Sequence, residues 1–256
     1  MPYEVTALRK SIAVLRVLAK STDAVGVTEL ARQAGVSKNM AFRICQTLCA
    51  EGWLLTEEGS RYRLTLTPFH VFAKPLERAQ LTTACIGPLQ ALASVTGQTA
   101  YISVLDGKRA VHVQVIEGQG AIRVAGAVGH AFPLHATAQG KVFLAWNPAL
   151  AQRVLCSRLT ANTAKTLVDP RRLERQLAEI RQHGYALNRE EYISGMVGCA
   201  APIRDRRGHV VAAVGIFAPT GNLDLAALRT MGSSVLCRTA YTISVALGHT
   251  IAGSRV

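Results

Sequence analysis

Apolar residues near the start of the chain recur every three or four positions in three separate segments. These segments, 6–20, 27–34 and 37–51, are predicted to be amphipathic helices. Gly35 stands between the last two, where a sharp helix–helix turn requires the left-handed backbone that glycine adopts most easily. Ser37 is a favourable N-cap for the third helix. The pattern therefore predicts two short helices joined by a tight turn, with the first helix packed under them.

A β-hairpin is predicted directly after the third helix. Residues 53–55 form its first strand, residues 57–60 its turn and residues 61–64 its second strand. Three helices followed by a hairpin are typical of a winged helix-turn-helix domain, whose second helix of the motif enters the DNA major groove. A pair of helices and a hairpin with no DNA role is the alternative interpretation.

The next segment is predicted to connect two domains. Pro68 opens a stretch of helical spacing and mixed charge, and Pro75 inside it is expected to kink or break the helix. A second helix is expected over 82–96 and ends at Gly97. The predicted organisation is a winged helix-turn-helix domain over 1–67, a linker helix over 68–82 and a second domain over 83–256.

After Gly97 the apolar pattern changes to the two-residue period of β-strands, with helical segments between pairs of strands. Paired strands with helices grouped between them predict an α+β domain around an antiparallel sheet. The expected strands are 101–105, 110–116, 122–128, 185–188, 199–204 and 210–217, and the expected helices are 138–146, 149–157, 170–183 and 223–250.

The third helix of the first domain carries polar and basic residues in its first two turns. Its apolar residues Phe42, Cys45, Leu48 and Cys49 are expected to form a separate, buried face. The residues predicted to bind DNA, in this helix and in the hairpin, are Ser37, Lys38, Asn39, Met40, Arg43, Arg61 and Arg63.

These candidates differ in the part of DNA that each would contact. Ser37 and Lys38 are expected at phosphates, assisted by the helix dipole. Asn39 and Arg43 are the candidates for base recognition, since asparagine pairs with adenine and arginine with guanine. Arg61 and Arg63 are expected at the DNA backbone or minor groove; for Arg63 an inward-facing side chain is the alternative. For each residue an ordinary solvated helix face is also possible.

Composition and charge indicate the class of partner but do not locate its binding site on the chain. With 256 residues, 49% of them hydrophobic, the chain is long enough for two folded domains. Its net charge of +13 suits a polyanionic partner such as double-stranded DNA. Residues 1–80 hold 11 Lys and Arg against 7 Asp and Glu, a net of +4, and residues 81–256 hold 18 against 9, a net of +9. Charge alone therefore does not place the DNA site.

The compartment is expected to be the cytoplasm. Six cysteines without disulfide or metal-ligand spacing predict free thiols in a reducing environment. Arg16 and Lys20 interrupt the first apolar segment, which excludes it as a signal peptide. The uncharged run 239–253 is too short and polar to cross a bilayer. No membrane partner is expected.

No catalytic or metal-binding constellation is recognisable. His130 and His135 lack the further ligands of a zinc site, and His135 is expected to be a structural residue. Glu190 and Glu191 have no nucleophile or metal cluster to work with. No enzyme activity, cofactor or metal is expected. Residues 136–141 instead resemble a backbone anion site at a helix N-terminus, with a structural cap by Thr137 as the alternative.

Two segments of the second domain carry specific motifs. The first is PLHATAQGKVFLA at 133–145, and the second runs from GYALNREEYISG at 184–195 to AAPI at 200–203. Both segments resemble signatures of the IclR family of bacterial transcriptional regulators. The first domain is similar to the N-terminal domain of the same family. The resemblance implies a GAF/PAS-like effector domain, and dimers, often paired into tetramers, on palindromic operator DNA. It also implies repression or activation of catabolic genes in response to a small organic acid.

Carried over from the resemblance, the effector pocket is expected to be lined by Phe132, Ala138, Gln139, Asn188, Met196, Gly198, Gly215 and Phe217. His135, Thr137, Gly140 and Glu191 lie in the same motifs and are expected to shape its mouth and floor. The aromatic and thioether surface of this set favours an aromatic or medium-sized acid over a two- or three-carbon acid.

The sequence thus predicts a ligand-responsive transcription regulator. An enzyme on the GAF-like scaffold with an accessory nucleic-acid domain, and an architectural DNA-binding protein indifferent to ligands, are the alternatives.

Overall fold

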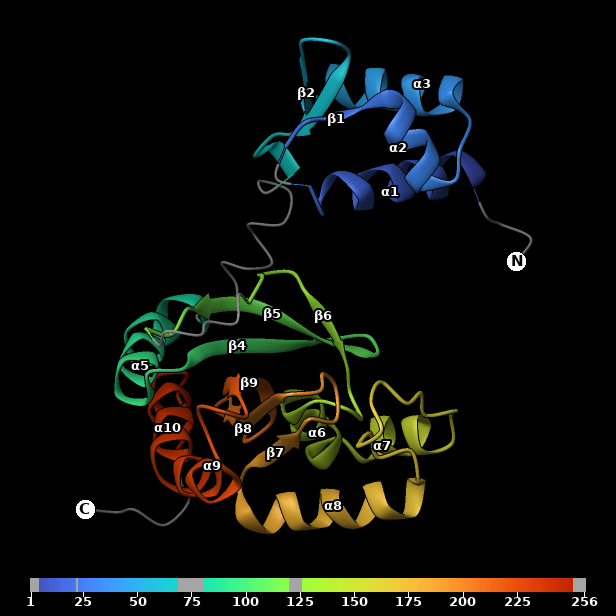
Figure 1. The fold of residues 1–256 in the computed structure, drawn as a ribbon. Helices are drawn as coiled ribbons and strands as arrows, with labels where there is room; N and C mark the ends of the chain where they lie inside the picture. The colour runs from blue at the N-terminus through green and yellow to red at the C-terminus, as the bar shows by residue number, and fades with distance from the viewer. Residues whose placement is uncertain (1–4, 22, 69–80, 120–125, 251–256) are drawn as a thin grey trace. The chain divides into compact units, whose positions relative to one another are not determined.

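The chain folds into two compact units, residues 1–78 (unit 1) and 79–256 (unit 2) (Figure 1). The structure, a computed structural model, describes residues 5–21, 23–68, 81–119 and 126–250. Most of the expected linker helix, with Pro75, lies outside these residues. The predicted boundaries at 1–67, 68–82 and 83–256 therefore stay predictions.

Unit 1 contains the expected helices and hairpin. Leu30, Ile44, Leu54 and Tyr62 are buried between them and form the centre of its core. The elements are α1 (Thr6–Leu18), β1 (Val25–Gly26), α2 (Val27–Ala34), α3 (Lys38–Ala50), β2 (Leu54–Glu57) and β3 (Arg61–Leu64). The strands form an antiparallel sheet in the order β1-β3-β2. Strand β1 was not predicted, because two residues are too short to show an alternating pattern.

The turn between α2 and α3 is built as the sequence predicts. Gly35 has φ +65° and ends α2 in the left-handed conformation. Ser37 caps α3, with its Oγ accepting a hydrogen bond from the backbone N–H of Met40 at 3.3 Å. The direction in which α3 starts is therefore fixed by two residues that lie next to each other in sequence.

The predicted buried face of α3 is wrong in one respect. The buried residues are Ala41, Ile44 and Cys45, whereas 44% of Phe42 is exposed. Successive helical residues point about 100° apart, so a stripe through Ala41 and Ile44 directs Phe42 away from the core. Phe42 therefore lies on the exposed part of α3.

Unit 2 is built on a six-stranded, fully antiparallel sheet in the order β6-β5-β4-β9-β8-β7. This arrangement confirms the predicted α+β class. The strands are β4 (Thr99–Asp106), β5 (Arg109–Ile116), β6 (Ala131–Pro133), β7 (Ala186–Arg189), β8 (Met196–Arg204) and β9 (Val210–Pro219). The helices are α5 (Leu81–Thr96), α6 (Ala138–Trp146), α7 (Pro148–Leu155), α8 (Pro170–His183), α9 (Leu225–Met231) and α10 (Cys237–Ala246).

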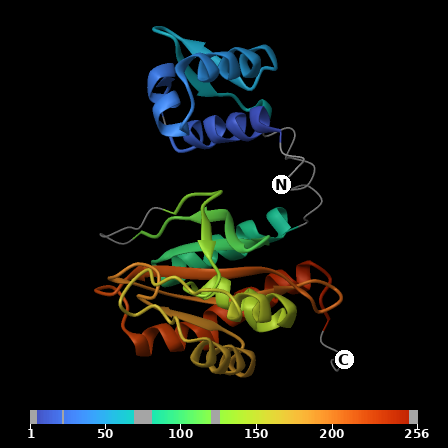
Figure 2. The ribbon, with the colours of Figure 1, turned by 90° about the vertical axis from the view of Figure 1, so that its right-hand side faces the viewer.

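Alternate residues of the sheet enter two different cores. Ile102, Cys199 and Val214 pack with α5, α9 and α10, and Figure 1 shows α5 and α10 side by side. Ala200 and Ala213, each one position along, pack with α6, α7 and α8 on the other face. Figure 2 shows α7 and α8 on the same side of the sheet. The sheet is thus covered by helices on both faces.

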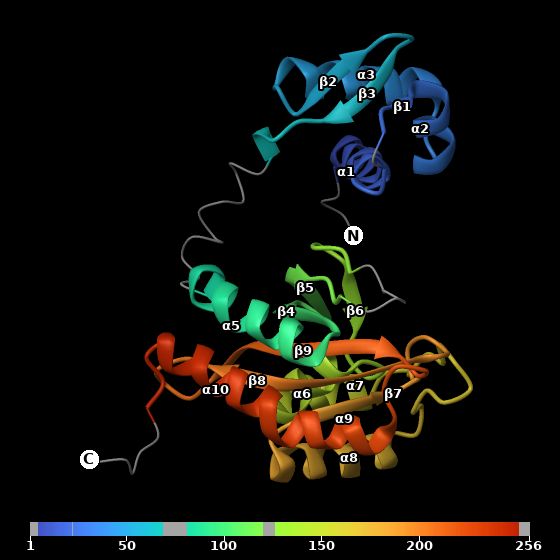
Figure 3. The same ribbon diagram turned by 60° about the vertical axis from the view of Figure 1, so that its left-hand side comes forward.

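Two expectations for unit 2 differ from the structure. The predicted strand 122–128 is absent at residues 126–128, and its residues 122–125 lie outside the described part of the chain. The described sheet is extended by β6 at Ala131–Pro133, after Gly129 has turned the chain with φ +84°. The long helix expected over 223–250 is divided into α9, a π-helical turn at Gly232–Leu236 and α10 (Figure 3).

The π-helical turn has a local packing reason. Gly232 lies so close to the ring of Tyr185 that a Cβ atom would stand 2.5 Å from its Cδ2. A π-helical turn adds a residue within a continuous helix and so rotates the side chains that follow it around the helix axis.

In the part of the chain that the structure describes, no helix has the length and apolar character needed to cross a membrane.

Candidate functional site

A cavity of about 150 Å³ lies on the α6 face of the sheet in unit 2. It is lined by Phe132, Ala138, Gln139, Asn188, Met196, Gly198 and Phe217, all of them residues expected in the pocket, and by Thr137. Sequence reasoning missed its further lining residues Tyr101, Gly126, Ala127, His112, His130, Tyr192, Ile193 and Val197. The missed residues include most of the aromatic rings.

Gly215, the remaining residue of the expected pocket, does not line the cavity. Its backbone lies against the ring of Tyr101, where an added Cβ would stand 2.3 Å from both Cζ and Oη. The same Cβ would also stand 2.7 Å from the carbonyl oxygen of Cys199. Gly215 therefore makes room for Tyr101 and acts on the cavity only through that ring.

Tyr101 and Gln139 join the sheet to α6 at the inner end of the cavity. The hydroxyl of Tyr101 donates a hydrogen bond to Oε1 of Gln139 at 2.9 Å. Only 2% of Tyr101 is exposed, and burial raises the pKa of its hydroxyl well above the ordinary value. The hydroxyl thus stays a donor, which leaves the amide N–H groups of Gln139 to face the cavity.

The cavity wall is a set of aromatic rings in contact. The ring centroid of His112 lies 4.4 Å from that of Tyr101 and 4.3 Å from that of Phe132. Phe217 stacks on Tyr101 at 5.7 Å, and Tyr192 meets Phe132 edge-on at 5.5 Å. Aromatic faces arranged in this way offer a flat, largely apolar surface to a ligand.

His112 contributes an imidazole ring to this wall. Burial, with a smaller contribution from His130, lowers the pKa of His112 to about 3, so the imidazole is neutral at physiological pH. Its Nδ1 lies 2.8 Å from Oγ of Ser103, the residue opposite it in the β4–β5 ladder. The ring is therefore held in one orientation by a hydrogen bond inside the sheet.

The N-terminus of α6 borders the cavity. Thr137 caps this helix: its Oγ1 accepts from the N–H of Gly140 at 3.2 Å and donates to the carbonyl of Pro133 at 2.8 Å. Gly140 lies against the backbone of Leu134, where a Cβ would stand 2.3 Å from the carbonyl oxygen. The structural cap by Thr137 is thus confirmed. The first N–H groups of α6 lie beside the cavity, at a position that suits an anion.

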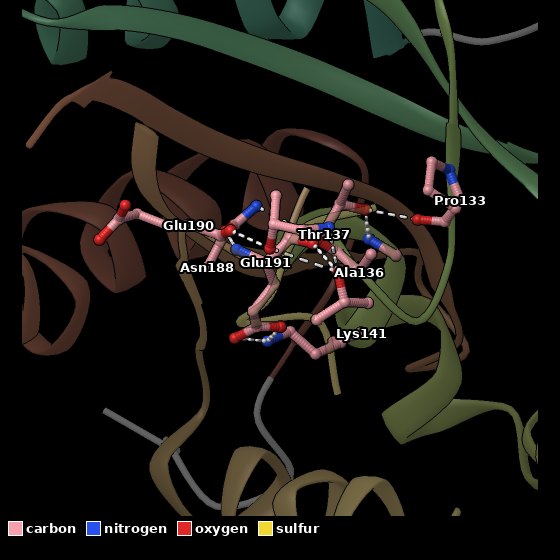
Figure 4. Close-up of polar contacts among 10 residues, drawn as sticks. Pro133, Ala136, Thr137, Lys141, Asn188, Glu190 and Glu191 are labelled. Atoms are coloured by element: carbon pink, nitrogen blue, oxygen red, sulfur yellow. Dashed lines mark hydrogen bonds and ion pairs between the residues drawn. The ribbon is translucent and has the colours of Figure 1, made fainter. Parts of the chain in front are cut away.

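A buried ion pair lies behind the cavity. Nζ of Lys141 on α6 is 2.6 Å and 2.9 Å from the two carboxylate oxygens of Glu191, and both side chains are buried (Figure 4). Burial lowers the pKa of Lys141, and the adjacent Glu191 carboxylate opposes that shift. Glu191 therefore holds the segment after β7 against α6 and does not line the cavity.

Asn188 connects this ion pair to the cavity. Its Nδ2 donates to the carbonyl of Ala136 at 3.3 Å, and its Oδ1 accepts from the backbone N–H of Glu191 at 3.0 Å (Figure 4). Thr166 adds a bond to the carbonyl of Glu191 at 2.6 Å. Both ends of the Asn188 amide are thus held by backbone groups, which fixes this side of the cavity.

His135 has a structural place, as the sequence predicts. Its Nε2 lies 2.9 Å from the carbonyl oxygen of Thr160, and the side chain does not line the cavity. Among the described residues no group of three His, Cys, Asp or Glu side chains lies close enough together to hold a metal ion.

In unit 1 the predicted DNA-binding residues occupy different environments. Lys38, Asn39 and Arg43 are exposed on α3, while Met40 is half-buried against the core. Neither Lys38 nor Arg43 has an ion-pair partner among the described residues. The charged end of α3 is therefore open to a partner.

The two arginines of β3 differ in what they contact. Nε of Arg63 lies 2.8 Å from a carboxylate oxygen of Glu57, and both side chains are exposed, so the inward-facing alternative is wrong; Tyr62 faces the core instead. Arg61 donates to the carbonyl of Ala24 from Nε at 3.0 Å and from Nη2 at 2.6 Å. Arg61 thus holds β3 to the segment before α2.

Comparisons with known proteins cover both units. Residues 73–245 match the family model of the bacterial transcriptional regulator IclR C-terminal domain, and residues 7–58 match that of the IclR helix-turn-helix domain. The chain is 31% identical over 222 residues to the HTH-type transcriptional regulator KdgR of Dickeya chrysanthemi, covering 86% of this chain and 72% of that protein. It is also 31% identical over 224 residues to the glycerol operon regulatory protein of Streptomyces griseus, covering 87% and 88%.

Solved structures share the fold over nearly the whole chain. IclR of Thermotoga maritima has a TM-score of 0.78 and 27% identity, and the match covers 96% of this chain and 100% of that one. An IclR homologue of Microbacterium hydrocarbonoxydans, crystallised with 4-hydroxybenzoate, has a TM-score of 0.82 and 22% identity, with 94% and 99% covered. The second likeness shows the fold alone.

Proposed function

Because this chain belongs to the IclR family of bacterial transcriptional regulators, we propose that a small aromatic acid bound in unit 2 controls its affinity for operator DNA. Proteins of this family are DNA-binding regulators and not enzymes. The observation that carries the proposal is the ring-lined cavity at the N-terminus of α6.

The DNA-binding part of the proposal rests on α3. Ser37 and Lys38 stand at its N-terminus, where the helix dipole and a cation favour a phosphate. Asn39 and Arg43 are exposed one turn apart and would contact base edges in the major groove. The exposed ring of Phe42 offers an apolar contact to a thymine methyl group. Met40 supports α3 from the core side. Arg63, which is exposed on β3, would approach the DNA backbone from the hairpin, whereas Arg61 supports the hairpin through its bonds to Ala24.

The ligand part of the proposal rests on the size and chemistry of the cavity. A cavity of about 150 Å³ has the size of one known to accept benzene, which favours a ligand with a single ring. No Lys, Arg, Asp or Glu is among the described residues that line it. The carboxylate of the ligand would therefore be bound by backbone N–H groups at the start of α6, with its ring against Phe132 and Phe217. The 4-hydroxybenzoate complex of the Microbacterium homologue is consistent with this class.

The assembly and the cellular role follow from the same proposal. The protein would act in the cytoplasm as a homodimer or tetramer, because two recognition helices are needed to read the two halves of a palindromic operator. Effector binding in unit 2 would change operator affinity by favouring one of two arrangements of the paired helices. Genes for degradation of the acid are the proposed targets, under repression or activation.

Binding of the full-length protein to DNA and to benzoates tests the proposal. In a gel-shift titration at moderate salt, we expect a fragment from upstream of its own gene to bind at least tenfold tighter than a shuffled duplex. We expect one or more monocyclic aromatic acids to change that affinity and to be recovered unaltered.

Each other outcome contradicts a specific part. Equal affinity for the two duplexes would remove the operator-binding role. Sequence preference that no acid changes would favour a ligand-indifferent architectural protein, and conversion of the acid would favour an enzyme.

A further inference from the structure

Two histidines line the described part of the cavity, His112 and His130, and only His112 has a ring nitrogen hydrogen-bonded to another side chain. Nδ1 is bonded to Ser103, and the ring is held between Tyr101 and Phe132, while Nε2 has no hydrogen-bond partner among the described residues. Only 1% of His112 is exposed, and the residue lines the cavity, so its free Nε2 faces the cavity. A ligand in the cavity would therefore decide whether Nε2 is satisfied.

The tautomer of His112 follows from the needs of Ser103. Ser103 is fully buried, and its hydroxyl has Nδ1 of His112 as its one hydrogen-bond partner in the described structure. If Nδ1 carried the proton, the Ser103 hydroxyl hydrogen would be buried without an acceptor, which is costly. If Ser103 donates to Nδ1, no donor is lost, and the proton of the neutral ring is on Nε2. His112 therefore presents an N–H to the cavity.

We propose that His112 is a specificity-determining residue that selects ring acids carrying a hydrogen-bond acceptor, such as a hydroxyl or oxo oxygen, opposite its Nε2–H. This inference rests on the proposed function, in which the cavity binds a monocyclic acid. In this arrangement the backbone at the start of α6 binds the ligand carboxylate, and Phe132 and Phe217 contact the ligand ring. His112 contacts a substituent on that ring. A methyl group at this position would leave the Nε2–H buried and unpaired, whereas a hydroxyl oxygen would accept its hydrogen bond.

Calorimetric titration of the full-length protein with two matched series of probes tests this role. The probes are 2-, 3- and 4-hydroxybenzoate, each compared with the methylbenzoate of the same substitution pattern and nearly the same size. We expect at least one hydroxybenzoate to bind about tenfold tighter than its methyl partner, the size expected of one net hydrogen bond. In His112→Phe, which keeps a ring in the wall, we expect the two to bind equally.

Two further variants separate this role from general damage to the cavity. His130→Phe changes another histidine that lines the same cavity and stacks on Phe132, and we expect it to keep the hydroxyl preference. Ser103→Ala leaves all lining residues in place but removes the group that fixes the tautomer, and we expect the preference to fall. Ser103→Ala also carries the test if His112→Phe does not fold.

The outcomes distinguish this inference from the proposed function. Benzoates that bind the wild-type protein without any hydroxyl preference would overturn the role of His112 alone. A preference that persists in His112→Phe, or that disappears equally in His130→Phe, would overturn it as well. Absence of benzoate binding would overturn the proposed aromatic effector and this inference together.

Discussion

The polar and basic candidate DNA-binding residues of unit 1 are exposed, whereas most polar residues at and behind the cavity of unit 2 are buried. Lys38, Asn39 and Arg43 lie on the outside of α3, a few residues from the cap that orients them. In unit 2, bonds join residues far apart in sequence: Tyr101 to Gln139 and Lys141 to Glu191. The geometry of the first site is therefore set locally, and that of the second depends on the whole domain.

The largest expected effect comes from breaking the buried ion pair of unit 2. Lys141→Met leaves the Glu191 carboxylate buried without its partner, and we expect a loss of about 3–5 kcal/mol in the stability of this unit. Differential scanning calorimetry on the full chain should show a lower transition for unit 2 and an unchanged one for unit 1. Lys165→Met, which removes an exposed partner of Glu190, is the matched control and should change much less.

The double variant Lys141→Met/Glu191→Leu sharpens the same comparison. Removing both charges leaves no unpaired ion, so much of the lost stability should return. A double variant as unstable as Lys141→Met would show that the ion pair itself, and not the burial of a lone charge, stabilises unit 2.

In unit 1, removal of an exposed charge from α3 should weaken DNA binding without lowering the stability of the fold. Arg43→Ala is expected to weaken discrimination at one base pair of each half-site by about 1–3 kcal/mol. Competition gel shifts with single-base operator variants measure it, and thermal unfolding should be unchanged because Arg43 is exposed. Arg32→Ala on α2, whose guanidinium pairs with Glu29, is the control and should leave base preference intact. Equal discrimination in Arg43→Ala and wild type would exclude base recognition by Arg43.

The two units should also differ in their response to acid. The pKa of His112 is about 3 in the folded chain against 6.5 as its ordinary value. The unfolded chain therefore takes up this proton first as the pH falls, and stability is lost from about pH 6.5 downward. At pH 5 the expected loss from this residue is roughly 2 kcal/mol, about 1.4 kcal/mol for each pH unit. Chemical denaturation of wild type and His112→Phe at pH 7 and pH 5 measures it; parallel losses in both would contradict the assignment.

The smallest expected effect concerns the start of α3. Ser37→Ala removes the bond to the N–H of Met40 and should destabilise unit 1 by about 1 kcal/mol. Ser11→Ala removes a hydroxyl from the interior of α1 and is the matched control, expected to cost little. A Ser11→Ala protein as unstable as Ser37→Ala would mean that the cap contributes nothing specific.

The same contrast explains which features could be predicted from the sequence. The turn at Gly35, the cap at Ser37 and the strands beside the turn at Asp106 and Gly107 follow from neighbouring residues. Phe42 was misplaced because its exposure depends on where the rest of unit 1 packs. The division of the last helix depends on Tyr185, which approaches Gly232 from a distant part of the chain.

For the cavity, motifs indicated half of the lining residues and missed most of the aromatic rings. Tyr101 and His112 stand at ordinary strand positions, so alternation alone gives them no special role. A usable signal was present, however: the turn at Asp106 and Gly107 places Ser103 directly opposite His112. Two polar side chains facing each other on the inner face of a hairpin need a shared hydrogen bond, and this indicates a polar site.

The pairing of β4 with β9 has a consequence for a chain still being synthesised. Tyr101 lies opposite Gly215 in this ladder, so the inner wall of the cavity joins residues made early to residues made late in unit 2. A nascent polypeptide that has not reached Val210 already contains the complete helix α3 but lacks strand β9, which supplies Phe217 to the cavity and places Gly215 against Tyr101. Unit 1 can thus fold while the cavity of unit 2 is still incomplete, and translation through β9 is needed to build it.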